Sequence, residues 1–502
     1  RGYDSAGVAL TAPGMDKVVV RKKAGRLKNL VEDIERKPMP LATVGIGHTR
    51  WATNGEPSDV NAHPHTSMDG KVAIIHNGII ENASQLRLDL QAEGYRFASA
   101  TDTEVAAKLL GKIVDKIIAD EGKPDLFKAV RRMARMLEGA FTILATDCRQ
   151  PDIVVGARHD SPLVVGLGEE ENFLGSDVAA FVAYTKRAME VDQDQAVCVS
   201  ADKVIVTDFD GNVVENPKTY TVDWDASAAE KGGWDSFMDK EIHEDPAAVQ
   251  RTLLGRFDAN GGITLDEVRI DEHDFKAIDK IIVVACGTAS YAGQVAKYAI
   301  EHWVRIPVEI ELAHEFRYRD PILTPRTLVV AISQSGETMD TLMALRHARE
   351  QGSKVLAICN TQGASIPRES DAVLYTHAGP EVAVASTKAF VAQITAAYLL
   401  GLYLAQVKGA MFRDEIHQVL DSLKDMPRKI QWVLDTQPKT IQAAAERMVN
   451  ANSFLFLGRH VGYPVALEGA LKLKEIAYTF TEGFAAGELK HGPIALVDEG
   501  EP

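Results

Sequence analysis

Cysteine is scarce in this chain of 502 residues, and the few that occur form no motif. The four cysteines, Cys148, Cys198, Cys286 and Cys359, are widely spaced and include no Cys-x-x-Cys pair. Neither a disulfide framework nor a zinc site is therefore indicated. Such sparing use of cysteine is typical of proteins kept in a reducing cytosol, so we expect a cytoplasmic protein.

Long runs of basic residues are also missing. Lys and Arg number 55 against 71 Asp and Glu, which gives a formal net charge of −16. A chain of this charge repels nucleic acids and anionic membrane surfaces, and neither is an expected partner. Any phosphate group must then be held by local hydroxyls and backbone dipoles.

We find no apolar stretch near the ~20 residues that a membrane-spanning helix needs, which predicts no membrane association. The first residues also lack the charged-then-apolar order of a signal peptide. The chain begins with Arg1 rather than Met and ends in a turn-like segment, residues 498–502. Both ends suggest a fragment of a longer protein.

What is present indicates an ordinary globular polypeptide, 46% hydrophobic and long enough for about three domains. The first 215 residues contain short β-branched segments, which predict strands near residues 7–10, 17–20, 72–75, 141–144, 152–155 and 201–214. Asp210-Gly211 predicts a hairpin turn in the last of these. Apolar periodicity predicts helices over 103–118 and 124–137, and the mixture indicates a layered α+β domain.

The second half has a different pattern. After a connector containing Pro217 and Gly232, continuous apolar strands are predicted at 280–285, 327–332 and 354–358, separated by helix-length segments. This alternation predicts a doubly wound α/β domain with a parallel sheet covered on both faces. A similar but weaker pattern, a strand at 453–458 followed by a helix over 464–478, suggests an incomplete second copy of the α/β unit with one strand and about one crossover.

Residues 333–338 read Ser-Gln-Ser-Gly-Glu-Thr and directly follow a predicted buried strand. Hydroxyls of Ser333, Ser335 and Thr338 can donate to phosphate oxygens, and a helix starting near Thr338 would aim its N–H groups at the anion. Because no Walker lysine follows the glycine, the loop suits a sugar phosphate better than a nucleoside triphosphate. The alternative is a serine-rich helix cap without a ligand.

Polar residues gather at predicted strand ends in the first half, in the segments 1–7, 47–53, 61–65, 76–82 and 101–104. Together these segments resemble the glutaminase domain of the N-terminal-nucleophile amidotransferases. The resemblance implies that Arg50 and Asp102 bind the α-carboxylate and α-amino groups of L-glutamine, with Trp51 packed over the pocket. Asn77 and Gly78 would donate hydrogen bonds to the tetrahedral oxyanion.

The nucleophile of that family is an amino-terminal cysteine, which this sequence lacks. Cys148 and Cys198 lie inside or beside predicted strands with no flanking His, and buried structural roles are expected for them. The chain as written is therefore expected not to hydrolyse glutamine. Four nearby histidines show neither an i, i+4 metal pair nor a carboxylate partner, so no metal is expected: His48, His63, His65 and His76.

Five segments of the second half, 285–288, 333–338, 384–390, 467–475 and 487–493, resemble in order the sugar isomerase (SIS) domains of the glutamine:fructose-6-phosphate aminotransferase family. The resemblance implies that the phosphate of fructose 6-phosphate is bound by five residues and that two more line the pocket. The phosphate-binding residues would be Thr288, Ser333, Gln334, Ser335 and Thr338, and the pocket residues Val384 and Ser386.

The same resemblance implies three catalytic residues. Glu475 would move the proton between C1 and C2, Lys472 would stabilise the developing oxyanion, and His491 would help open the sugar ring across a subunit interface. Helical i, i+3 spacing lets Lys472 and Glu475 face one pocket, although it also fits a solvated ion pair. Two departures are Ala289, where relatives often have a hydroxyl, and a Schiff-base lysine that would lie beyond Pro502.

These patterns predict five segments: a glutaminase domain at 1–215, a linker at 216–255, a first SIS domain at 256–410, a helical connector at 411–445 and the start of a second SIS domain at 446–502. The expected activity is the glutamine-dependent conversion of fructose 6-phosphate to glucosamine 6-phosphate, without a cofactor, by a homodimer. The alternative is a non-catalytic SIS regulator that binds sugar phosphates. Loops typical of phosphoribosylamine-forming or asparagine-forming amidotransferases are missing.

Overall fold

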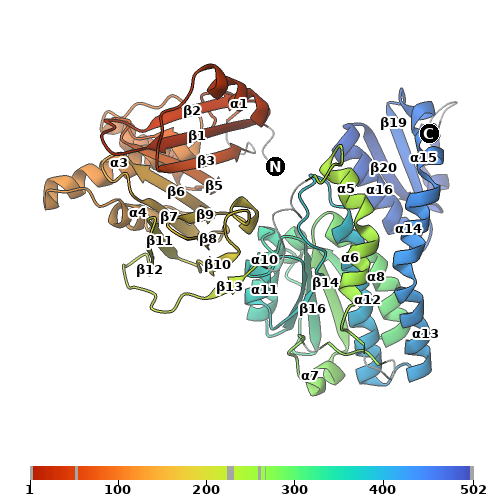
Figure 1. The fold of residues 1–502 in the computed structure, drawn as a ribbon. Coiled ribbons are helices and arrows are strands. Elements are labelled where there is room, and N and C mark those ends of the chain that lie inside the picture. The colour runs from red at the N-terminus through yellow and green to blue at the C-terminus, as the bar shows by residue number, and fades with distance from the viewer. Residues whose placement is uncertain (1–3, 51–54, 223–230, 258–261, 266, 498–502) are drawn as a thin grey trace. The chain divides into compact units, whose positions relative to one another are not determined.

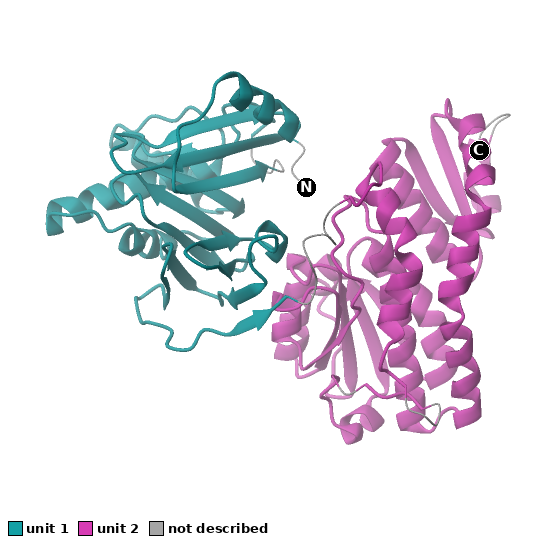
Figure 2. Cartoon of the chain, viewed as in Figure 1, with its two compact units in different colours: residues 1–226 teal, residues 227–502 magenta. Residues whose placement is uncertain are grey.

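The computed structural model describes residues 4–50, 55–222, 231–257, 262–265 and 267–497. The chain divides into two compact units, residues 1–226 and residues 227–502 (Figure 2). Each unit has its own sheets and its own core, and each is described by itself.

Unit 1 contains three antiparallel sheets (Figure 1). The first has the order β2-β1-β3 and is formed by β1 (Ser5–Thr11), β2 (Val19–Ala24) and β3 (Val44–Arg50). The second has the order β12-β11-β7-β6-β5-β4 and is formed by β4 (His65–Thr66), β5 (Val72–Gly78), β6 (Phe141–Asp147), β7 (Val154–His159), β11 (Gln195–Val199) and β12 (Val204–Asp208). The third has the order β13-β10-β8-β9 and is formed by β8 (Val164–Leu167), β9 (Asn172–Gly175), β10 (Arg187–Glu190) and β13 (Thr219–Thr221).

Alternation along β5 explains why unit 1 is layered. Val72 and Ile74 point to one face of the six-stranded sheet, where they pack in a core shared with three helices. Ala73 and Ile75 point to the other face, where they pack with residues of the three-stranded sheet such as Ile46. Because both faces are apolar, the sheet is buried between a helical layer and a second sheet, which confirms the predicted α+β sandwich.

The helices of unit 1 are α1 (Leu27–Arg36), α2 (Ala83–Ala92), α3 (Asp102–Glu121), α4 (Leu126–Ala134) and the 3-10 helix η1 (Val178–Ala180). Thr101 caps α3 by accepting a hydrogen bond from the amide of Glu104, and Gly122 ends it with φ of 77°. The predicted turn at Asp210-Gly211 also forms, since the amide of Gly211 donates to Asp208 and Thr207 pairs with Val213.

The larger sheet of unit 2 is parallel and has the order β15-β14-β16-β17-β18. Its strands are β14 (Lys280–Ala285), β15 (Val308–Leu312), β16 (Thr327–Ser333), β17 (Lys354–Cys359) and β18 (Ala372–Tyr375). One face is covered chiefly by α6 (Asp245–Leu253), α7 (Glu272–Ala277), α8 (Thr288–Val304) and α12 (Lys388–Lys408). The other is covered by α9 (Ala313–Phe316), α10 (Met339–Glu350) and α11 (Ser365–Glu369) (Figure 1). The predicted doubly wound arrangement is therefore confirmed.

Helix α12 corrects one expectation from the sequence. This helix of 21 residues contains an 18-residue window with a mean hydropathy of 1.5, so it is long and apolar enough to cross a membrane by length and composition. The statement that no apolar stretch approaches a membrane span is therefore wrong. The helix is apolar because it is central to unit 2, where Ala396, Leu399 and Leu400 belong to the main core and α8 packs alongside. A buried core helix needs the same composition as a membrane span.

The remaining elements of unit 2 precede and follow this sheet. They are α5 (Phe237–His243), α13 (Arg413–Lys424), α14 (Met426–Thr436), α15 (Pro438–Met448), β19 (Ser453–Gly458), α16 (Gly462–Ala477), β20 (Phe480–Ala485), η3 (Glu488–His491) and η4 (Pro493–Leu496). Strands β19 and β20 pair in parallel with α16 as their crossover. The predicted second copy thus contains two strands rather than one, because residues 480–485, assigned to no element from the sequence, form a strand.

Candidate active sites

The predicted glutamine-binding residues of unit 1 converge around the end of β3. His48 on β3 places its Nε2 2.8 Å from the side-chain oxygen of Asn77 on β5, so its ring N–H donates to that oxygen. With its oxygen occupied, the amide of Asn77 presents its NH2 group to a ligand. This is the orientation that an oxyanion donor needs.

Arg50 lies two residues beyond His48 and is 4% exposed. Its Nη2 donates to the carbonyl of Gly55 at 2.9 Å, and its Nη1 lies 3.9 Å from Oδ1 of Asp4. The guanidinium is thus fixed between a backbone carbonyl and a carboxylate. A fixed guanidinium fork is suited to binding a carboxylate such as that of an amino acid.

Asp102 occupies the first position of α3 and is 7% exposed. Its Oδ2 accepts from the amide of Ile80 at 3.0 Å, and its Oδ1 accepts from the amide of Thr103 at 2.9 Å. The bond to Ile80 connects the carboxylate to the segment that follows Asn77 and Gly78. Carboxylate, oxyanion donors and guanidinium are therefore linked through short segments of one unit.

Gly78 ends β5 with φ of 114°, a region that other residues rarely adopt. A Cβ at this position would lie 2.0 Å from the carbonyl oxygen of Ala140 on the neighbouring chain segment. Glycine is thus required by both conformation and space, and it leaves the backbone next to Asn77 exposed. Trp51, predicted to pack over the pocket, lies outside the described residues.

Three histidines of unit 1 are kept neutral by their burial. Burial lowers the pKa of His65 to about 3 and that of His76 to about 4. It also lowers the pKa of His63 well below its usual range, with neighbouring His48 acting in the same direction. The positive charge near the oxyanion donors therefore comes from Arg50 rather than from imidazolium groups.

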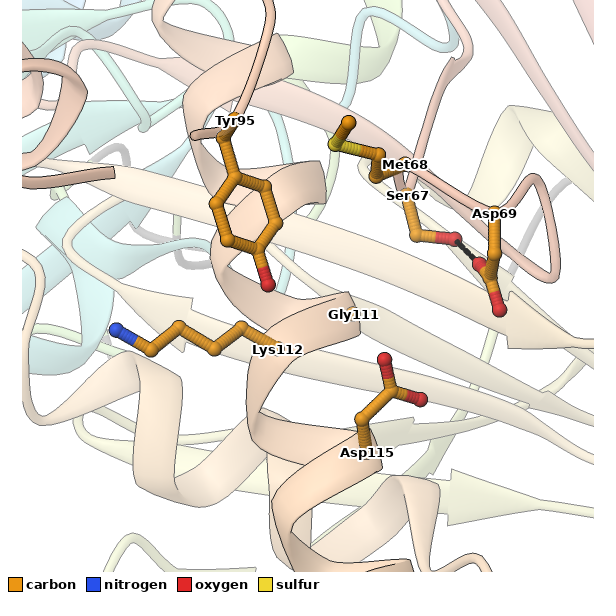
Figure 3. A pocket seen from close by; sticks show the side chains of 7 residues that line it. All are labelled: Ser67, Met68, Asp69, Tyr95, Gly111, Lys112 and Asp115. Carbon is orange, nitrogen blue, oxygen red and sulfur yellow. Dashed lines mark hydrogen bonds between the residues drawn. The ribbon is translucent and has the colours of Figure 1, made fainter. Parts of the chain in front are cut away.

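A second cavity on unit 1, of about 290 Å3, opens beside α3 (Figure 3). It is lined by Ser67, Met68, Asp69, Tyr95, Gly111, Lys112 and Asp115. None of the predicted glutamine-binding residues lines it, and both of its acidic side chains already have partners, Ser67 for Asp69 and Arg149 for Asp115. We assign it no role.

The candidate sugar-phosphate site of unit 2 lies at the switch point of the parallel sheet. The connection from β14 leads outward to β15 on one side, whereas β16 lies on the other side. In open α/β sheets, a ligand crevice forms at this point, outside the carboxyl ends of the strands. Thr288 follows β14, and the loop 333–338 follows β16, so the predicted phosphate contacts flank this crevice.

Two serine hydroxyls of the loop 333–338 accept hydrogen bonds from amides of the same loop. Ser333 Oγ accepts from the amide of Gly336 at 3.0 Å, and Ser335 Oγ accepts from the amide of Glu337 at 3.2 Å. Each hydroxyl accepts from the backbone, so its own hydrogen can point to an anion. Ser333 Oγ also lies 3.3 Å from Thr338 Oγ1, and Thr338 is the N-cap of α10.

Gly336 and Glu337 hold this loop against β17 and α11. At φ of 68°, a Cβ on Gly336 would lie 2.6 Å from Cβ of Ala364 and 2.8 Å from Sγ of Cys359. Glu337 would repel a phosphate, but its Oε1 accepts from the amide of Ser365 at 2.9 Å. That hydrogen bond directs the carboxylate toward α11.

The predicted catalytic pair lies beside Thr288. Lys472 on α16 donates to Oε2 of Glu475 at 2.7 Å and to Oγ1 of Thr288 at 3.1 Å. The structure thus brings a predicted phosphate contact and two predicted catalytic residues together from α8 and α16. The arrangement is more than the solvated ion pair that spacing alone allowed.

Glu468 completes this cluster and was missed in the sequence. Its Oε1 accepts from Thr288 Oγ1 at 3.0 Å and lies 3.4 Å from Nζ of Lys472. Burial raises the pKa of the Glu468 carboxyl, while Lys472 and Thr288 oppose the rise. The hydroxyl hydrogen of Thr288 is directed to Glu468 here, so it must turn before it can donate to a phosphate. Glu468 stands one turn before Lys472, and that i, i+4 spacing could have identified it.

Val384 and Ser386 lie on the segment before α12. Val384 is 59% exposed, and Ser386 Oγ donates to Oε2 of Glu381 at 3.0 Å. Glu381 Oε1 also accepts from the amides of Thr387 and Ala389. The segment is further held from α5, where Glu241 Oε1 accepts from the amides at 382 and 383 at 2.6 and 3.0 Å.

His491 lies on η3 and is exposed. In the part of the chain that the structure describes, no hydrogen bond or ion pair joins it to Lys472 or Glu475.

Comparison with known proteins gives matches to both halves. The model of a glutamine amidotransferase domain matches residues 48–183, and that of the SIS domain matches residues 275–403 and 447–502. Among solved structures, the C-terminal domain of glucosamine-fructose-6-phosphate aminotransferase from Francisella tularensis is 42% identical with a TM-score of 0.53, and the match covers 54% of this chain and 76% of that one.

Curated relatives are similar over the whole chain. Proteins named glutamine–fructose-6-phosphate aminotransferase (isomerizing) are 63% identical in Corynebacterium diphtheriae and 59% identical in Streptomyces coelicolor. In both comparisons the match covers all of this chain, with 79% of the first relative and 80% of the second.

Proposed function

This chain belongs to the family of isomerizing glutamine–fructose-6-phosphate aminotransferases, and from that membership we infer its reaction. It is an aminotransferase that takes the amide nitrogen of glutamine and converts fructose 6-phosphate to glucosamine 6-phosphate, leaving glutamate. Glutamine and fructose 6-phosphate are its substrates. The non-catalytic regulator is not favoured.

We propose that unit 1 binds glutamine through Arg50 and Asp102. Support comes from the buried guanidinium of Arg50 and from Asp102, a carboxylate whose bond to Ile80 places it next to the oxyanion donors. Asn77 and the backbone of Gly78 would then stabilise the oxyanion that forms when the amide is attacked. The NH2 group of Asn77 is available because His48 binds its oxygen.

We propose that the switch-point crevice of unit 2 binds the sugar phosphate and isomerises it. The contact of Lys472 with both Thr288 and Glu475 is the observation that carries this assignment. Glu475 would remove a proton next to the carbonyl or imine carbon, and the nearby ammonium would stabilise the negative charge that develops on oxygen. Gln334 and Val384 would complete the pocket.

The sugar-phosphate assignment is tested by calorimetric titration of fructose 6-phosphate into the chain. Replacing Ser335 and Thr338 together by Ala should weaken binding by about 1–3 kcal/mol for each hydrogen bond lost to the charged phosphate. Ser422→Ala is the matched control, because the hydroxyl of Ser422 lies on the exposed face of α13 and donates to the carbonyl oxygen of Gln418. Unchanged affinity in the double variant would place the phosphate elsewhere.

We also propose that the protein acts in the cytoplasm as a homodimer in which His491 reaches the site of a second copy. Support for this arrangement comes from the exposure of His491 on η3. In the full-length protein, mixing His491→Ala subunits with Glu475→Gln subunits should restore part of the activity that each has lost. Failure of mixed dimers to regain activity would contradict the shared site.

A further inference from the structure

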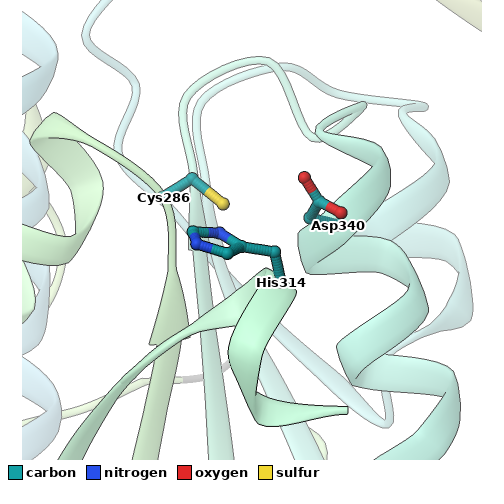
Figure 4. Close-up of side chains that lie close together, drawn as sticks. All are labelled: Cys286, His314 and Asp340. Carbon is teal, nitrogen blue, oxygen red and sulfur yellow. The ribbon is translucent and has the colours of Figure 1, made fainter. Parts of the chain in front are cut away.

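Three potential metal ligands meet next to the switch point of unit 2 (Figure 4). The sulfur of Cys286, a ring nitrogen of His314 and a carboxylate oxygen of Asp340 all lie within 4.8 Å of one another. They are far apart in the sequence, so no spacing rule indicates them. Sheet topology brings them together, because each follows one of three neighbouring strands.

Each ligand stands close to the carboxyl end of its strand. Cys286 directly follows β14, His314 lies in α9 directly after β15, and Asp340 lies in the first turn of α10. Because β15, β14 and β16 are adjacent and parallel, these positions are set by backbone hydrogen bonding. A ligand set that rests on rigid elements keeps its geometry better than one on loops alone.

We propose that Cys286, His314 and Asp340 bind a divalent transition-metal ion, with Zn2+ as the best match. Thiolate, imidazole and carboxylate are the ligand types that zinc takes in proteins, at distances of about 2.0–2.3 Å. Around a tetrahedral ion such ligands stand roughly 3.5 Å apart, so ligand atoms that lie within 4.8 Å of one another need to approach by no more than about 1.3 Å. Hard ions such as Mg2+ are disfavoured because they prefer oxygen ligands.

The burial of the three groups agrees with a site open on one side. Cys286 and His314 are partly buried, whereas Asp340 is exposed. Three protein ligands would leave a fourth position for water, as in zinc sites that are not closed by protein. Coordination requires the thiolate, so binding of the ion releases the thiol proton of Cys286 to solvent.

This site is distinct from the residues proposed to bind sugar phosphate, although it lies beside them in sequence. Cys286 stands two residues before Thr288, and Asp340 stands two residues after Thr338. Binding of the ion can be measured without any sugar, so a failure of the metal site and a failure of the proposed function are separate results.

The test is titration of the 502-residue chain with Co2+ and Zn2+, without sugar. Co2+ should produce the near-ultraviolet charge-transfer absorption that marks cobalt–thiolate bonds, and Zn2+ should abolish it. Cys286→Ser should remove the absorption, and His314→Gln and Asp340→Asn should each weaken Zn2+ binding by at least about 10–100-fold, the loss that even outer-shell changes cause.

Two control variants separate this site from adventitious binding. His417→Gln removes an exposed histidine whose Nε2 lies 3.3 Å from Asp421, and Cys198→Ser removes a partly buried thiol of unit 1. Both should bind Zn2+ like the unchanged chain, and thermal unfolding without metal should show that all variants fold. Absence of the absorption, or full Zn2+ affinity in either His314→Gln or Asp340→Asn, would overturn the proposal.

Discussion

The two candidate sites differ in how their polar groups are held. In unit 1, Arg50 and Asp102 are buried and bonded largely to backbone groups. In unit 2, the amine of Lys472 is shared among oxygens of three side chains, one of which, Glu475, is exposed. Backbone contacts fix a binding geometry, whereas a shared ammonium can change partners during a reaction. The first arrangement suits recognition of one amino acid, and the second suits the movement of protons.

The largest effect is expected from Glu475→Gln, which tests whether unit 2 alone moves the proton. Loss of a general base typically costs about 10²–10⁴-fold in rate. In the full-length protein, sugar isomerisation measured by deuterium exchange should fall by this factor, while glutamine hydrolysis persists. Glu482→Gln, an exposed carboxylate on β20, is the control. Equal loss of both activities would assign Glu475 a role in folding.

The converse test is Asn77→Ala in unit 1. Removing one oxyanion donor typically lowers kcat by about 10²–10³-fold, and glutamine hydrolysis in the full-length protein should fall accordingly. Affinity for fructose 6-phosphate, measured by calorimetry, should not change. Asn172→Ala is the control, since its side chain binds the carbonyl of Ser200 away from this cluster. Normal hydrolysis in Asn77→Ala would show that another group stabilises the oxyanion.

The rigidity of the loop 333–338 is tested by comparing Gly336→Ala with Gly352→Ala. Both glycines have positive φ, but a Cβ meets Ala364 and Cys359 at the first position and nothing within 4 Å at the second. Both variants bear the conformational cost of about 1–2 kcal/mol. Gly336→Ala should lose about 1–3 kcal/mol more in the free energy of unfolding, measured in urea, because of overpacking. Equal losses would mean that the loop can shift.

The smallest effect concerns Asp245, at the start of α6. Burial raises its pKa from 3.8 to about 7, with Glu381 acting in the same direction and Lys388 opposing it. The folded chain therefore keeps this proton to higher pH than the unfolded chain, and stability contributed by the protonated group is lost as pH rises from about 4 to about 7.

Asp245→Asn should remove this dependence. We expect the variant to match the unchanged chain near pH 4 and to exceed its free energy of unfolding by about 1–2 kcal/mol near pH 8, measured by urea unfolding. Asp435→Asn, on the exposed face of α14, should leave the pH profile unchanged. A profile in Asp245→Asn identical to that of the unchanged chain would show that the carboxyl is ionised throughout.

Local patterns were enough to predict the parts of the fold built from neighbouring residues. The loop 333–338 is one strand end followed by one helix start, and its conformation follows from Ser333, Gly336 and Thr338 themselves. The alternation of apolar strands with helices likewise predicted the parallel sheet. Residues 480–485 were missed as a strand because Thr481, Glu482 and Gly483 interrupt any apolar run, and pairing with β19 supplies what propensity does not.

The sites were less accessible to such patterns, because their residues come from distant segments. The pairing of His48 with Asn77 and the contact of Thr288 with Glu468 join segments through tertiary packing. Resemblance to a family supplied the candidate residues there, but not their partners. The Cys286, His314 and Asp340 cluster shows the limit most clearly, since only strand order places these three side chains together.

Hydrogen bonds to Glu241 fix the segment before α12 to the beginning of unit 2. Glu241 lies on α5. Its carboxylate accepts hydrogen bonds from the amides of residues 382 and 383, next to Val384 and Ser386. The side chain of Lys388 is 1% exposed and forms an ion pair with Glu244. The segment that carries Val384 and Ser386 is therefore anchored to the first helices of unit 2 by two carboxylates, independently of the hydrogen bonds of the parallel sheet.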